Sequence, residues 1–243
     1  MPSFTSLLKV SLLAVTVLLS ACATTQHAEE VNDPWEGYNR TMYSFNDTLD
    51  RFVAKPIAKG YDAVLPDAIS QGVTNFFSNL LGIQVVFNDL LQFKFSQAAD
   101  DAGYFLLNTT VGVLGIFDVA GHAGYKRGNE DFGQTLGAWG VGQGPYVVLP
   151  IIGPSTVRDG TGLLIDFNVT DPIAYIDHVP TRNRLYGAYF VDTRANLLGL
   201  EKVLDEAALD EYSYVRDAYL QRRQNLVYDG DPPEEDFDVF EDD

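Results

Sequence analysis

Apolar residues recur along most of the chain at the spacing of an α-helix. The clearest stripe has members separated alternately by four and three residues: Phe76, Leu80, Ile83, Phe87 and Leu90. A helix is also predicted over residues 96–108, and another after Asp210, which can cap its start. The sequence has no sustained alternation of apolar and polar residues, which half-buried strands show. The pattern predicts a mainly α fold with long, glycine-rich connections.

The longest predicted connection, residues 132–157, contains no charged residue. Its 26 residues are enough on paper to cross a bilayer, but nine of them are glycine or proline. A lipid-exposed span must satisfy each backbone group within its own helix, so this segment is predicted to be a structured loop instead. Gly140, Gly142 and Gly144 resemble a phosphate-binding loop only weakly, because their spacing departs from G-x-G-x-x-G and no Gly-Lys-Ser/Thr follows.

The N-terminus has the pattern of an export signal. The apolar run 10–19 is about half the roughly 20 residues needed to span a bilayer. Leu19, Ser20 and Ala21 precede Cys22, and this tetrapeptide resembles the bacterial lipobox, in which the cysteine thiol carries diacylglycerol. Residues 1–21 are therefore predicted to be a lipoprotein signal peptide, Cys22 the lipidated residue and 22–33 a linker. An ordinary cleavage site beside a stray cysteine is the alternative.

Composition narrows the classes of function. The chain has 34 acidic and 16 basic residues, a net charge of -18, which argues against nucleic-acid binding. With 46% hydrophobic residues it is apolar enough to fold, and its single cysteine excludes a disulfide framework or a thiolate zinc cluster. Residues 229–243 hold nine acids and no base, so they are predicted to be a solvated, disordered tail that serves solubility or docking.

The sequence offers little catalytic or metal-binding chemistry. His27 lies in the predicted linker, which leaves His122 and His178 as imidazoles of the folded body. No G-x-S-x-G nucleophile motif and no metal spacing such as H-E-x-x-H is present. Four scattered acids are predicted to cap helices or turns: Asp118, Asp159, Asp166 and Asp171. We therefore predict no catalytic residue, no metal site and no cofactor.

Several motifs occur in a fixed order. They are DPWEGYNR at 33–40, NFFSNL at 75–80, GIFDVA at 115–120, DFGQTLG at 131–137, GVGQGPY at 140–146 and RDAY at 216–219. In this order the chain resembles the MlaA/VacJ lipoproteins of Gram-negative outer membranes, from about residue 33 to residue 222. The resemblance implies a single helical domain over residues 34–228, ring-like, with amphipathic helices in the membrane plane around an amphipathic channel.

The resemblance also implies a function without covalent chemistry. Such proteins are thought to take mislocalised phospholipids from the outer leaflet and pass them to a soluble periplasmic carrier, MlaC, and many associate with trimeric porins. The expected location is the outer membrane, lipid-anchored on its periplasmic face. Candidates for the lipid pathway are the stripe Phe76–Leu90 and the glycines Gly140, Gly142 and Gly144. Candidates for carrier contact are Tyr212, Arg216, Tyr219 and Arg222.

Two other classes stay open from the residues. One is a structural, porin-associated lipoprotein, which would bind a porin without passing lipid. The other is a phospholipase or acyltransferase, which needs a nucleophile within hydrogen-bond reach of a base.

Overall fold

The computed structural model describes residues 33–199 and 210–233. These residues belong to one compact unit, Asn32–Glu234. The predicted signal peptide, the lipidated Cys22, all but the last residue of the predicted linker, and residues 234–243 of the predicted tail lie outside the described residues.

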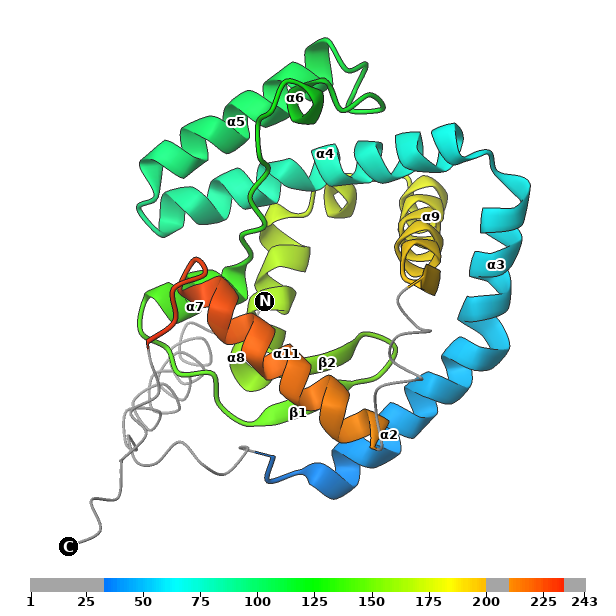
Figure 1. The fold of residues 1–243 in the computed structure, drawn as a ribbon, viewed down its shortest axis with the longest axis vertical. Coiled ribbons are helices and arrows are strands. Elements are labelled where there is room, and N and C mark those ends of the chain that lie inside the picture. Colours follow the sequence, from blue (N-terminus) through cyan, green and yellow to red (C-terminus); the bar gives the residue numbers. More distant parts are fainter. Residues whose placement is uncertain (1–32, 200–209, 234–243) are drawn as a thin grey trace, which may run out of the picture. The chain divides into compact units, whose positions relative to one another are not determined.

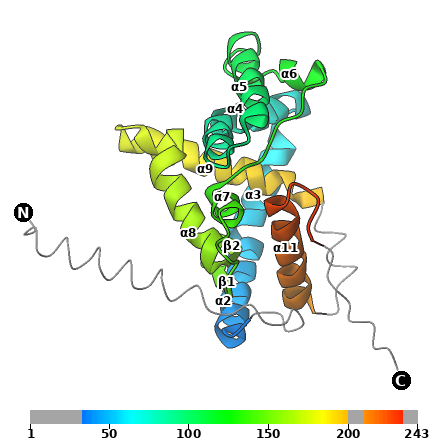
Figure 2. The same ribbon diagram turned by 90° about the vertical axis from the view of Figure 1, so that its left-hand side faces the viewer.

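The described residues form helices and one small hairpin (Figures 1 and 2). The α-helices are α2 (Glu36–Leu49), α3 (Lys55–Val64), α4 (Asp67–Leu91), α5 (Phe95–Thr110), α6 (Val119–His122), α7 (Phe132–Ala138), α8 (Val157–Ile165), α9 (Val179–Asn196) and α11 (Glu211–Val227). Two π-helical turns, η2 (Asp50–Ala54) and η3 (Asp166–Thr170), and a 3₁₀ turn, η4 (Pro172–Tyr175), continue them. Strands β1 (Tyr146–Leu149) and β2 (Gly153–Thr156) pair antiparallel, with Tyr146 opposite Thr156. The prediction of a mainly α fold is confirmed.

Helices α2, α3 and α4 follow one another as an arc, with α9 packed against α3 and α4 (Figure 1). The π-helical turn η2 joins α2 to α3 without a break. The corner before α4 arises because Leu65 precedes Pro66, and a residue before proline is driven out of helical geometry into the extended conformation found here. Helix α5 packs along α4, so the two form a hairpin of helices.

The sequence predicted a loop over residues 132–157, and the structure corrects this. The segment contains α7 and both strands of the β-hairpin. Asp131 starts α7 by accepting a hydrogen bond from the backbone N–H of Gln134 at 2.9 Å. Helices α7 and α8 then approach closely, and a Cβ on Gly162 would lie 2.3 Å from the backbone nitrogen of Gly133. Strands of four residues are too short to leave a period in the sequence.

Polar residues dominate the interior of the described part. Among residues 33–199 and 210–233, ten apolar residues are buried, against eighteen that are polar or charged, while thirty-five large apolar side chains are exposed. Water-soluble proteins show the reverse preference. Exposed apolar surface on this scale marks contact with a membrane or a partner. No helix of the described part has the length and hydropathy that a membrane span requires.

Helix α4 shows directly this exchange of buried polar for exposed apolar side chains. Phe77 and Val85 are buried on it, but most of its buried face is small or polar: Gly72, Asn79, Gly82, Asn88 and Asp89. The predicted stripe lies elsewhere, with Phe76 and Leu80 half-buried and Ile83, Phe87 and Leu90 exposed. The spacing therefore predicted the helix correctly, while the side that it buries is a different one.

Buried ion pairs hold the C-terminal helix to the rest of the unit. Arg223 on α11 donates to Asp159 at 3.0 and 3.1 Å and also to Asp131, and Tyr219 donates to Asp159 at 3.0 Å. Next to them, Tyr146, Val148 and Tyr212 form an apolar cluster. Asp159 therefore ties α8 to α11.

The prediction that scattered aspartates cap helices or turns is confirmed for Asp118 and Asp171, which cap α6 and η4. Asp166 instead accepts a hydrogen bond from the backbone N–H of Phe132.

We expect Arg223→Leu to lower the free energy of unfolding by about 3 kcal/mol, because it leaves two largely buried carboxylates without their shared cation. Arg222→Leu is the matched control: Arg222 is exposed and makes no hydrogen bond or ion pair within the described residues, so its removal should change stability by less than about 0.5 kcal/mol. Chemical denaturation followed by circular dichroism measures both. Equal losses in the two variants would contradict this role of Arg223.

Three carboxylates are buried where α4, α5 and the segment before α7 meet: Asp89, Asp101 and Glu130. Burial and, after it, the charges of Asp101 and Glu130 together raise the pKa of Asp89 to about 7, against a lowering by Lys94. Neither oxygen of Asp89 accepts a hydrogen bond from the described residues. In the unfolded chain its pKa is near 4, so between about pH 4 and 7 the folded state binds the extra proton. The free energy of unfolding therefore falls as the pH rises through that range.

Asp89→Asn should remove this penalty, since a neutral amide needs no proton. We expect the variant to be more stable than the unmodified chain by roughly 1–3 kcal/mol at pH 8 and equal to it near pH 4. Asp100→Asn on the exposed side of α5 is the control and should give no pH-dependent difference. Denaturant titrations at the two pH values measure the effect, and a difference independent of pH would contradict the assignment.

Candidate functional site

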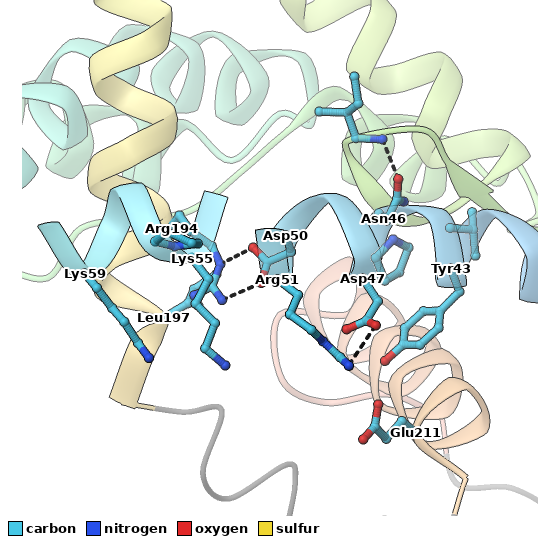
Figure 3. Close-up of a pocket in the computed structure, with 15 residues that line it drawn as sticks. Tyr43, Asn46, Asp47, Asp50, Arg51, Lys55, Lys59, Arg194, Leu197 and Glu211 are labelled. Carbon is cyan, nitrogen blue, oxygen red and sulfur yellow. Dashed lines mark hydrogen bonds and ion pairs between the residues drawn. The ribbon is translucent and has the colours of Figure 1, made fainter. Parts of the chain in front are cut away.

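A cavity of about 880 Å³ lies between α2, η2, α3, the β-hairpin, α9 and the start of α11 (Figure 3). Four cations line it: Arg51, Lys55, Lys59 and Arg194. Three acids also line it: Asp47, Asp50 and Glu211. Val148, Ile151, Pro154 and Leu197 supply apolar wall. The lining is therefore amphipathic, with more positive than negative groups.

The row of cations follows from helical spacing. Arg51, Lys55 and Lys59 are four residues apart along η2 and α3, which places them along one side of the helix. Phe52 and Ile57 on the same run do not line the cavity and are 74% and 51% exposed. The same helical run thus presents charge to the cavity and apolar side chains to its surroundings.

Ion pairs hold some of the charged side chains that line the cavity. Arg194 donates to Asp50 from two nitrogens, Nε to Oδ1 at 2.5 Å and Nη2 to Oδ2 at 2.7 Å, and its side chain is only 11% exposed. Arg51 donates to Asp47 at 2.9 Å. Lys59 makes no ion pair with any residue in the described ranges. The two-point pair holds α9 to the junction of α2 and α3, as Figure 3 shows, and Lys59 keeps its charge for another partner.

Two asparagines hold the hairpin against α2. Asn39 donates to the carbonyl oxygen of Tyr146 at 3.1 Å and accepts from the N–H of Val148 at 2.8 Å. Two turns later, Asn46 donates to the carbonyl of Leu149 at 2.9 Å and accepts from the N–H of Ile151 at 2.7 Å. These amides pair with the strand as a third strand would, and they position the apolar wall of the cavity.

A family model described as MlaA lipoprotein matches residues 31–226, which is most of the chain. The chain belongs to the MlaA lipoprotein family. The Escherichia coli K12 protein named "Intermembrane phospholipid transport system lipoprotein MlaA" is 36% identical over 232 residues, covering 92% of this chain and 90% of that protein. A Haemophilus influenzae protein of the same name is 35% identical over 220 residues and covers 88% of each chain. An uncharacterised protein of Rickettsia bellii is 34% identical over 198 residues, covering 82% of this chain and 78% of that protein.

The fold agrees with a solved structure as well. A structure from work on the "Structural basis for maintenance of bacterial outer membrane lipid asymmetry" superposes with a TM-score of 0.70 at 35% identity. The match covers 80% of this chain and 98% of that chain.

Within this MlaA fold, three predicted carrier contacts have partners inside the described unit: Tyr212 is buried, and Arg216 and Tyr219 are half-buried. Tyr212 is 3% exposed and its hydroxyl donates to Asp33. Burial, followed by that hydrogen bond, raises the pKa of Tyr212 well above its usual value. Tyr219 is half-buried against Asp159, and Arg216 pairs with Asp33 at 3.5 Å and Asp217 at 2.8 Å. These three residues stabilise the attachment of α11, and their contact with a carrier stays a prediction.

The predicted lipid-pathway residues lie away from the cavity. The stripe Phe76–Leu90 lies on an outer side of α4, and Gly140 and Gly142 are exposed after α7. None of these residues, nor Gly144, lines the cavity of Figure 3 or the smaller cavity between α4 and α9. Their part in a lipid pathway stays a prediction.

Sequence reasoning missed the cationic row. Its signal was present, because Arg51, Lys55 and Lys59 repeat at four-residue intervals beside apolar Phe52, Val53 and Ile57. Arg194 carries no such signal, since only the fold brings α9 to this position.

Gly140 and Gly142 differ in backbone conformation. Gly140 has φ +85°, in the left-handed region, whereas Gly142 lies outside that region and has open space for a Cβ. We expect Gly140→Ala to lower the free energy of unfolding by about 1–2 kcal/mol and Gly142→Ala to leave it within about 0.5 kcal/mol. Parallel thermal melts test this, and a larger loss for Gly142→Ala would refute it.

Proposed function

We propose that this chain removes phospholipids from the outer membrane and passes them to a soluble carrier in the periplasm, with headgroups moving through the main cavity. The names of its MlaA relatives support this, since they describe lipoproteins of an intermembrane phospholipid transport system. The reaction is transfer, without bond cleavage.

The observation that carries the proposal is the two-sided helical run η2–α3. Its cations line the cavity, while its exposed apolar residues Phe52 and Ile57 lie outside the cavity lining. A phospholipid has roughly 30 tail methylenes, and at about 0.8 kcal/mol each their exposure to water would cost on the order of 20 kcal/mol. Transfer therefore needs apolar contact for the tails together with a polar lining for the headgroup. Lysine and arginine are suited to its phosphate.

The outward apolar residues also suit a protein seated in a lipid leaflet. Their lipid contact would remove the exposed apolar surface from water, which is favourable by about 25 cal/mol per Å². A lipid anchor on Cys22 would keep the chain at the outer membrane, on its periplasmic face. A trimeric porin and an MlaC-like carrier are the partners proposed, and Arg222 is the predicted carrier contact that remains exposed.

An enzymatic alternative has less support. His122 contacts the backbone oxygen of Asp118, and His178 contacts the hydroxyl of Thr181 next to the start of α9. Neither lines the cavity. Reconstitution with fluorescent phospholipid and the soluble carrier separates the classes. Transfer without fatty-acid release supports the proposal, fatty-acid release indicates a phospholipase, and porin binding without transfer indicates a structural lipoprotein.

We expect Lys59→Glu to slow transfer to the carrier by roughly 5- to 10-fold, because it places a negative charge where the phosphate passes. Arg184→Glu is the matched control, since Arg184 is exposed on α9, lines neither cavity and undergoes the same charge reversal. Initial rates of dequenching in the reconstituted system measure both. Equal rates for the two variants would rule out a headgroup path at Lys59.

A further inference from the structure

A second cavity, of about 310 Å³, lies between α4, α9 and the segment before α7. This volume is at the lower end of the roughly 300–1,000 Å³ of small-molecule sites. Phe77, Leu81 and Tyr189 form apolar wall, and the rings of Phe77 and Tyr189 are 5.2 Å apart. Arg127 and Asp192 are the charged groups of its lining.

Arg127 lacks a partner of its own among the described residues. Its guanidinium makes no hydrogen bond and no ion pair within residues 33–199 and 210–233, and its Nε is buried without an acceptor. Burial lowers the pKa of Arg127, while the charges of Tyr104 and Asp101 oppose this through space. Asp101 accepts instead from the N–H of Gly128 at 2.6 Å. A partly buried cation without a partner is costly, so an anionic ligand would be stabilising at this position.

The other charged group is fully engaged. Asp192 accepts from the Tyr61 hydroxyl at 2.9 Å, from Thr74 at 3.0 Å and from Asn196 at 3.4 Å. Ser78 and Thr193 also line the cavity, and their hydroxyls make no hydrogen bond within the described ranges. The unused donors of the cavity are therefore those of Arg127, Ser78 and Thr193.

We propose that this second cavity binds a phosphate group through the guanidinium of Arg127, with the hydroxyls of Ser78 and Thr193 as further donors. The planar guanidinium offers paired N–H donors that match two oxygens of a phosphate. The phosphate belongs to a lipid headgroup or is the free ion, since both present the same oxygens.

The site deepens the proposed function, on which its lipid assignment rests. Leu197, at the end of α9, lines both cavities. Arg194 lines the first cavity, and Tyr189, Asp192 and Thr193 line the second. Helix α9 therefore separates two anion-binding positions, one at the cationic row and one at Arg127.

Calorimetric titration of the full-length, lipidated protein in detergent tests the site. The probes are dihexanoyl phosphatidylglycerol below its micelle concentration and, separately, inorganic phosphate. We expect Arg127→Gln to weaken one class of sites by roughly 10-fold or more, Arg127→Lys to weaken it less, and Lys126→Gln, at an exposed neighbour, to stay within about twofold. Tighter Arg127-dependent binding of the lipid than of the ion assigns a headgroup, and the reverse assigns free phosphate. Equal binding by all four proteins overturns the proposal.

Melting without ligand separates binding from a structural role. If Arg127 serves a ligand, Arg127→Gln melts at the same temperature as the unmodified chain or higher, because an unpaired buried charge is lost. A lower melting temperature with unchanged binding assigns Arg127 to the fold and overturns the proposal. Arg127-dependent binding in a protein that transfers no lipid retains the site and rejects the proposed function. Lipid transfer without any Arg127-dependent binding retains the proposed function and rejects the site at Arg127.

Discussion

The pairing of polar groups removed from water governs most of this structure, because its interior is mostly polar; Asp89 and the Nε of Arg127 are exceptions among the described residues. In an apolar core, packing supplies the stability, but here buried asparagines, aspartates and arginines do much of that work. Arg223 with Asp131 and Asp159, and Asn39 with the edge of β1, are examples. Such a network is stable only when its members are satisfied. In the proposed function, the apolar residues left outside would find their favourable environment in lipid.

This inversion also positions the candidate site. The cations of the run η2–α3 line the cavity together with the hairpin and α9, while Phe52 and Ile57 on the same run are exposed outside it. The pair between Asp50 and Arg194 sets the distance of α9 from that run. Helix α9 then has different groups on its two sides, with Arg194 lining the main cavity and Asp192 beside the second one. Cations thus line both cavities, each beside apolar wall, as the proposed binding of a phosphate-bearing molecule requires.

The sequence predicted the helices better than their environment. The spacing of apolar residues predicts which of them share a helix face, as for Phe76 and Leu90. It does not predict what that face contacts, because lipid, a partner and the core all favour the same apolar side chains. The burial of Asn79 and Asn88 on α4 was therefore not predictable from the spacing. The hairpin was missed because each strand has four residues. Tyr212 was assigned to the surface because no local signal reports its hydrogen bond to Asp33, 179 positions away. The row of Arg51, Lys55 and Lys59 could be predicted from the sequence, because these cations repeat every four residues. The position of Arg194 beside them could not, because it depends on how α9 packs in the fold.

The most direct test of the account measures what touches each side of the η2–α3 run in a membrane. Nitroxide labels at Phe52, Ile57, Asp47 and Lys59 of the protein reconstituted in vesicles can be compared for collision with oxygen and with a water-soluble nickel reagent. The account predicts that labels at Phe52 and Ile57 collide mainly with oxygen, as in lipid, and that labels at Asp47 and Lys59 collide mainly with the nickel reagent. Equal access of the nickel reagent to all four positions would contradict it.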